Sequence, residues 1–254
     1  QGLLEEALHS LDRSAALDPK SWEAHYFRGC CLEQLGRWPE ALQAQQRAIA
    51  SGAQIPVVLM NIGICHFELG DDASARWTLE KAYEAEQAGT MGGWSGCGAS
   101  LAECMRVQGE LDAARALCLE SMELIESRDH FVRAAGRVTA LLALGRVATD
   151  QGDEEGARAA LDQCLGLVED KRFLSHVKIQ AMCALSRATG STEPYERAQS
   201  EYEPGQPTRF PWGGWSSDQR TLLELARAAR TLGRDDECAE FERLAREYGA
   251  LRPL

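Results

Sequence analysis

The chain has 254 residues, of which 44% are hydrophobic and 26% charged, a composition too apolar for a disordered protein. Its formal charge of −12 would repel phosphate backbones and anionic lipids, which argues against nucleic acid and membrane as partners. No apolar run approaches the roughly 18 residues that a spanning helix needs, and no signal peptide is visible. The first residue is Gln1 rather than Met, so we expect the natural chain to begin further upstream.

Pairs of glycines recur along the sequence, with the two members seven positions apart. The pairs are Gly29 with Gly36, Gly63 with Gly70, and Gly145 with Gly152. Five positions after the second glycine comes a small residue, and between these marks the apolar residues recur at intervals of three and four, as in an amphipathic helix. Because a glycine ends a helix cheaply in a left-handed conformation and small residues let two helices approach, the pattern predicts stacked helical hairpins.

The same spacing, together with capping residues, predicts where each helix begins and ends. Ser21, Ser175 and Ser217 are placed to cap helix N-termini, and Pro39 lies in a first turn, where its missing N–H costs nothing. In chain order, the expected helices are residues 3–17, 21–35, 38–51, 55–69, 72–88, 97–108, 111–127, 131–151, 154–170, 174–189, 193–202, 217–232 and 235–248. The predicted fold class is therefore all-α.

These units resemble the tetratricopeptide repeat. The clearest unit runs from Lys20 to Ala53, and the 34 positions from Gly29 to Gly63 match the family's repeat length. Later units are longer, up to 43 positions between Gly109 and Gly152. The resemblance implies a right-handed superhelical solenoid of about six antiparallel hairpins, in which each hairpin contacts its neighbours.

The array is interrupted by a segment rich in proline and glycine. Residues 203–216 contain three prolines and three glycines, which exclude a helix. We expect helical repeats over residues 1–202, with an incomplete first hairpin. We expect residues 217–254 to form a final hairpin that continues the same solenoid.

A four-residue motif, GGWS, occurs at residues 92–95 and again at 213–216, each time before the first helix of a hairpin. One interpretation is a loop whose tryptophan covers the neighbouring hairpin. The other is a binding loop in which Trp94 and Trp215 are exposed anchors for a partner. The sequence leaves both interpretations open.

The nine cysteines lack the spacing of a metal site, because no C-x-x-C pair occurs. Cys31, Cys65 and Cys104 occupy equivalent positions beside the close helix contact, where a free cysteine acts as a small hydrophobe. We expect these three to be buried, reduced and unligated; a metal site and a redox switch are the alternatives. Free thiols favour a reducing compartment, which predicts a cytoplasmic protein.

Motifs for catalysis and for cofactors do not occur in the sequence. It contains no H-E-x-x-H, no G-x-x-x-x-G-K-[ST] and no G-x-S-x-G. We therefore expect no enzyme, no metal and no cofactor.

In the tetratricopeptide family the first helix of each hairpin lines the concave surface, so the resemblance implies which side chains face a partner. The expected groove residues are Tyr26, Val57, Met60, Asn61, Ile64, Phe67, Arg106, Arg146, Arg187, Arg220, Arg227 and Arg230. The arginines suit carboxylates, since a guanidinium donates two parallel hydrogen bonds. Two alternatives stay open: the arginines pair with acidic residues of the same chain, and the apolar side chains are buried by the adjacent hairpin.

The resemblance implies a scaffold that binds another protein or peptide on its concave face, and the arginines suggest a partner with an acidic segment. The alternative is a sensor or regulatory arm of a larger multidomain protein in signalling or transcription regulation. The long later units and the beginning of the sequence in mid-hairpin favour that alternative.

Overall fold

The computed structural model of the chain describes residues 2–89, 96–126, 130–169, 174–203 and 217–250. Within those ranges the regular structure is helical, and no strand occurs. The helices are α1 (Gly2–Leu17), α2 (Trp22–Gln34), α3 (Trp38–Ala50), α4 (Pro56–Glu68), α5 (Asp72–Gln87), α6 (Cys97–Val107), α7 (Leu111–Glu126), α8 (His130–Gln151), α9 (Glu154–Val168), α10 (Ser175–Thr189), α11 (Glu193–Glu201), α12 (Asp218–Thr231) and α13 (Asp235–Glu247). The all-α prediction is confirmed. None of the described helices is both long and apolar enough to cross a bilayer.

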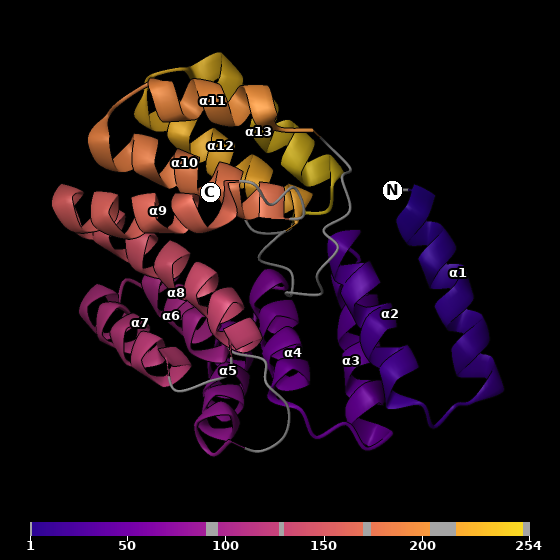
Figure 1. The fold of residues 1–254 in the computed structure, drawn as a ribbon. Helices are drawn as coiled ribbons and strands as arrows, with labels where there is room; N and C mark the ends of the chain where they lie inside the picture. Colours follow the sequence, from indigo (N-terminus) through magenta and orange to yellow (C-terminus); the bar gives the residue numbers. More distant parts are fainter. Residues whose placement is uncertain (1, 90–95, 127–129, 170–173, 204–216, 251–254) are drawn as a thin grey trace.

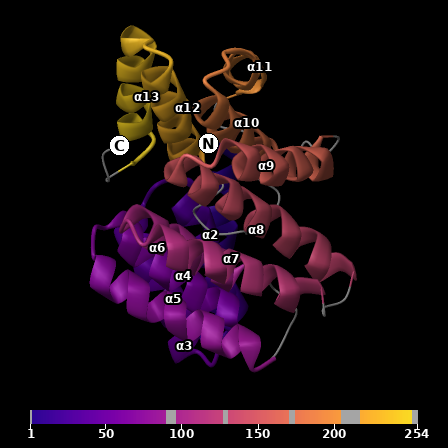
Figure 2. The same cartoon turned by 90° about the vertical axis from the view of Figure 1, so that its left-hand side faces the viewer.

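Consecutive helices pack as antiparallel hairpins, from α2–α3 to α12–α13, while α1 packs as a single helix against α2. The first helices of successive hairpins also contact each other, as α10 does with α12. Figures 1 and 2 show that the array turns back on itself, so that the C-terminal hairpin (α12–α13) lies above the first hairpins. The right-handed solenoid of about six hairpins predicted from the repeat is confirmed.

The turns and helix contacts follow from the glycines of the repeat. Gly36 and Gly70 end their helices with φ of +70° and +82°, a region that other residues enter only with strain. Gly63 lies within α4, where an added Cβ would stand 2.6 Å from Cγ of Leu79 on α5. Glycine at this position therefore lets the two helices of the hairpin approach closely.

The core runs along the whole array, as expected when each hairpin buries the face of the next. Ala41 and Ala75, the small residues of the repeat, are fully buried. Cys65 and Cys104 are also fully buried, but Cys31 is only half-buried, so the prediction was wrong for Cys31. The difference follows from its position on α2, which α1 covers as a single helix rather than as a complete hairpin.

Candidate functional site: the inner face

We call the sides of α2, α4, α6, α8, α10 and α12 that meet in the middle of the molecule the inner face. The predicted groove residues lie on these helices and most of them are buried, but Arg230 is exposed and pairs with Glu242 on α13. Buried are Tyr26, Val57, Met60, Asn61, Ile64, Phe67, Arg106, Arg146 and Arg220. The side chains of Arg187 and Arg227 are 17% and 20% exposed, and that of Arg230 is 57% exposed. Trp94 and Trp215 lie outside the described residues.

The apolar side chains of α4 are part of the main core rather than an open surface. Val57, Met60, Ile64 and Phe67 belong to one buried cluster with residues of α2 and α6. The guanidinium carbon of Arg220 on α12 lies 4.8 Å from the centre of the Phe67 ring, a cation–π contact. The N-terminal and C-terminal hairpins therefore meet at α4.

A buried ion-pair cluster fills the inner face between α6, α8 and α10. Arg106 donates to both oxygens of Glu103 at 2.8 and 2.9 Å, and it also donates to Asp150. Arg187 reaches the other oxygen of Asp150 at 2.7 Å. Burial alone would raise the pKa of Glu103, but the guanidinium groups of Arg106 and Arg146 outweigh it and hold this pKa well below its ordinary value.

Glu224 on α12 joins this cluster and is 1% exposed. Nitrogens of three arginines approach its carboxylate: Arg227 at 2.6 Å, Arg146 at 3.2 Å and Arg187 at 3.7 Å. Burial opposes ionisation, but the charges of these arginines prevail and lower the pKa of Glu224 to about 2. The carboxylate is thus charged at neutral pH and is surrounded by guanidinium groups of α8, α10 and α12.

Polar contacts also join the last hairpin to the first two hairpins in the described part of the chain. Arg220 donates to Glu68 on α4 at 2.5 Å, and Gln219 donates to the carbonyl oxygen of Glu33 on α2 at 3.0 Å. At the end of α13, the Gly249 carbonyl accepts a hydrogen bond from the Trp38 indole at 3.0 Å. These contacts are hydrogen bonds and an ion pair.

On the inner face, guanidinium groups of arginines bind carboxylates. The arginines pair with acidic residues of the same chain, which is one of the alternatives that the sequence left open. Sequence spacing could have revealed Glu103 with Arg106 and Glu224 with Arg227, since residues three apart meet on a helix. It could not have revealed Arg220 with Glu68, which are 152 positions apart.

Two segments match models of known repeats. The fold is that of an α-solenoid built from helical hairpins, and tetratricopeptide repeat models match residues 1–56 and residues 138–170. The two matched segments are thus similar to tetratricopeptide repeats, the repeat that the spacing of the glycines predicted. A search of the curated proteins finds no match.

The solved structures that are similar in fold include two with a TM-score above 0.5. One is the APC/C hetero-tetramer Cut9–Hcn1, with a TM-score of 0.61 and 14% identity over 95% of this chain. The match covers 39% of that chain, so the present sequence spans less than half of its length. The other is a tetratricopeptide repeat protein from Parabacteroides merdae, with a TM-score of 0.57 and 13% identity, covering 98% of this chain and 88% of that one.

Proposed function

We propose that the chain is a scaffold that binds another protein or peptide, and that an acidic segment of this partner is received on the inner face. The observation that carries the proposal is the environment of Glu224. Its carboxylate, at the centre of the inner face, is held by Arg146, Arg187 and Arg227. A surface that holds one carboxylate of its own chain in this way has the chemistry to hold a partner's carboxylate there.

Access to this surface requires the C-terminal hairpin to move away from α2 and α4 and also from α8 and α10, where Arg146 and Arg187 hold Glu224. Leaving a buried arginine without its carboxylate would cost about 3–5 kcal/mol. We therefore expect the hairpin to move away only when another carboxylate takes the place of Glu224. A partner with carboxylates supplies that replacement, because it restores the ion pairs that Arg146 and Arg187 lose when Glu224 moves away with α12. This exchange is the physical reason for expecting an acidic partner in a chain whose net charge is −12.

The more exposed arginines give the partner a first point of contact. Arg227 is partly exposed, and Arg230, one turn further along α12, is largely exposed. Exposed charges act mainly on the association rate, whereas buried charge pairs act on the dissociation rate. We therefore expect Arg227 and Arg230 to speed capture and the buried arginines to retain the bound segment.

The test begins with a pull-down by the intact array, followed by mass spectrometry of the captured protein. The affinity of its acidic segment is then measured for Arg227→Ala and Arg230→Ala beside Arg158→Ala. Arg158 on α9 is a matched control because it is also exposed and pairs with a neighbouring acid, Glu154. We expect slower association and weaker salt dependence for the two α12 variants only. Equal weakening in the control would contradict the assignment to the inner face.

The alternative, a regulatory arm of a longer protein, is favoured by the closure of the inner face. We expect an inner face that the chain's own last hairpin closes to have an open and a closed state, and a neighbouring domain could favour either of them. The mass of the native polypeptide separates the two proposals. A product near the 27.9 kDa of this sequence supports the scaffold, and a much larger one supports the arm.

A further inference from the structure

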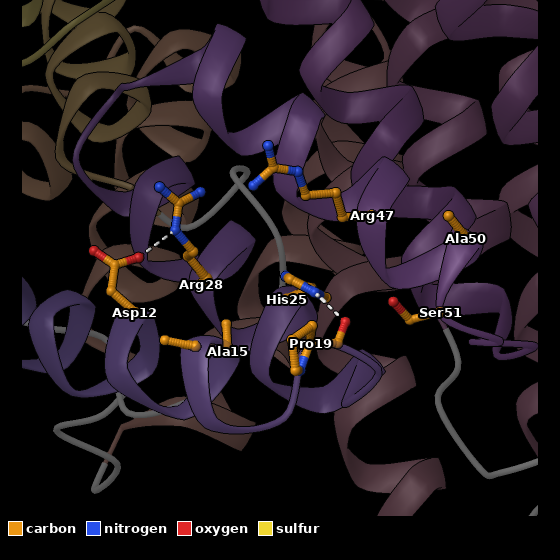
Figure 3. Close-up of a pocket in the computed structure, with 9 residues that line it drawn as sticks. Asp12, Ala15, Pro19, His25, Arg28, Arg47, Ala50 and Ser51 are labelled. Carbon is orange, nitrogen blue, oxygen red and sulfur yellow. Dashed lines mark hydrogen bonds and ion pairs between the residues drawn. The ribbon is translucent and has the colours of Figure 1, made fainter.

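A pocket of about 470 Å³ lies at the N-terminal end of the array, between α1, α2 and α3 (Figure 3). Small residues leave it hollow: Ala15 and Ala16 on α1, and Ala50 and Ser51 at the end of α3. Pro19 forms part of the wall. The ring of His25 is held there by the contact of its Nε2 with the Pro19 carbonyl at 3.2 Å. The pocket is thus a preformed hollow among short side chains.

The pocket is distinct from the inner face. Arg28 on α2 lines the pocket, whereas Tyr26 and Cys30 of the same helix face the core. Because each residue turns an α-helix by about 100°, a separation of two positions places Arg28 on the opposite side from both. Binding in this pocket therefore needs no movement of the C-terminal hairpin.

Two arginines and one carboxylate give the pocket its charge. Arg28 donates through Nε to Asp12 at 2.7 Å, and both residues line the pocket. Arg47 also lines it, with an exposed side chain that forms no ion pair within the described part of the chain. Figure 3 shows the guanidinium groups of Arg28 and Arg47 on the same side of the hollow, above His25. These charged groups sum to +1, in a chain whose net charge is −12.

We propose that this pocket binds the carboxylate of an acidic side chain on a partner peptide. A single negative charge balances the excess of +1, and a guanidinium presents the parallel N–H groups that a carboxylate accepts. Arg47 supplies the main contact, because Arg28 is already shared with Asp12. Ala15, Ala16 and Ala50 leave room for the methylene groups that precede the carboxylate. The site adds a second contact point to the proposed scaffold and does not depend on the inner face.

The experiment is a titration followed by amide chemical shifts, with three acetylated peptides and one inorganic anion as probes. Acetyl-Ala-Glu-Ala-amide offers a side-chain carboxylate, and acetyl-Ala-Gln-Ala-amide offers none. Acetyl-Ala-Gln-Ala with a free C-terminus offers a main-chain carboxylate, and inorganic phosphate offers a different anion. We expect the glutamate peptide to shift the resonances of Ser51 and His25 most strongly, with an affinity that falls as salt rises.

Two variants change the charge of the pocket in opposite directions. Arg47→Gln removes the unshared cation and should weaken the glutamate peptide about threefold to fivefold, the size of an exposed charge contact. Asp12→Asn releases Arg28 and raises the charge sum, so it should strengthen the same peptide about twofold to threefold. Asp12 and Arg47 are both exposed, which keeps the fold intact, and Arg158→Gln serves as the control.

The proposal is overturned if the glutamine peptide shifts the same resonances equally, or if Arg47→Gln leaves the affinity unchanged. Weaker binding by Asp12→Asn would also overturn it, since that result would make Asp12 part of the contact rather than a competitor. Tighter binding of the free C-terminus or of phosphate would reject the side-chain carboxylate as the ligand. None of these outcomes bears on the inner face, so the two sites are tested separately.

Discussion

The indole Nε1 of Trp38 donates a hydrogen bond of 3.0 Å to the carbonyl oxygen of Gly249, 211 positions later in the chain. Trp38 begins α3 and is fully buried, and Gly249 follows α13. This bond joins the first complete hairpin to the last. It accompanies the Arg220–Glu68 pair that closes the inner face between α12 and α4.

Replacing Trp38 with Phe tests the energy of this closure. Phenylalanine keeps most of the buried ring but removes the donor, so we expect a loss of about 0.5–1.5 kcal/mol plus a small packing cost. Trp77→Phe is the control, because Trp77 on α5 is 62% exposed and should change stability by less than about 0.5 kcal/mol. Unfolding in urea measures both. Equal stability of the two variants would mean that the Trp38–Gly249 bond contributes nothing.

Replacing Gly36 with Ala tests whether the two ends of the array pack closely, because Gly36 lies against the backbone that follows α13. A Cβ there would stand 2.4 Å from the carbonyl oxygen of Tyr248, and the residue has φ of +70°. Gly70 has φ of +82° and no atom within 4 Å of such a Cβ, so Gly70→Ala carries the backbone strain alone, about 1–2 kcal/mol. We expect Gly36→Ala to cost about 1–3 kcal/mol more than Gly70→Ala in chemical denaturation. Equal costs would show that the two ends do not pack closely in solution.

The buried carboxylates predict a loss of stability in acid. The pKa of Glu224 falls from 4.5 to about 2 in the folded chain, and the pKa of Glu103 is also lowered. Since a lowered folded pKa means that the unfolded chain binds the proton more tightly, this stabilisation is complete above about pH 4.5 and is lost as the pH falls toward 2. Urea midpoints across that range should fall, and more gently in Glu224→Gln. An equally steep fall in the variant would show that Glu224 does not contribute to the pH dependence of stability.

Thiol accessibility should separate one cysteine from the others. Cys31 is half-buried, whereas the other eight cysteines are buried. Burial raises the pKa of Cys118 and of Cys164 to about 12, which leaves almost no reactive thiolate at neutral pH. We expect a thiol reagent to label Cys31 first in the native chain and all nine in denaturant, as followed by peptide mass spectrometry. Rapid native labelling of Cys65 or Cys104 would contradict the packing described above.

The helices were predictable because their boundaries depend on local residues. Gly70 ends α4 in a left-handed turn, and Ser21 caps α2 by accepting from the Ala24 amide, as its position predicted. The closure was not predictable, because it depends on the summed rotation of successive hairpins rather than on any local spacing. Nothing near Trp38 in the sequence points to Gly249. For the same reason, the arginines could be placed on the inner face, but their burial there could not be foreseen.

The hydrogen exchange of the Trp38 indole proton tests the proposed function most directly. Its resonance is assigned by its disappearance in Trp38→Phe, and its exchange is measured in the free chain and in the complex with the captured acidic segment. If the partner displaces the C-terminal hairpin, the bond to Gly249 breaks, so we expect exchange in the saturated complex to be at least tenfold faster, about 1.4 kcal/mol of lost protection. Exchange that is unchanged or slower in the complex would contradict opening of the inner face by the partner.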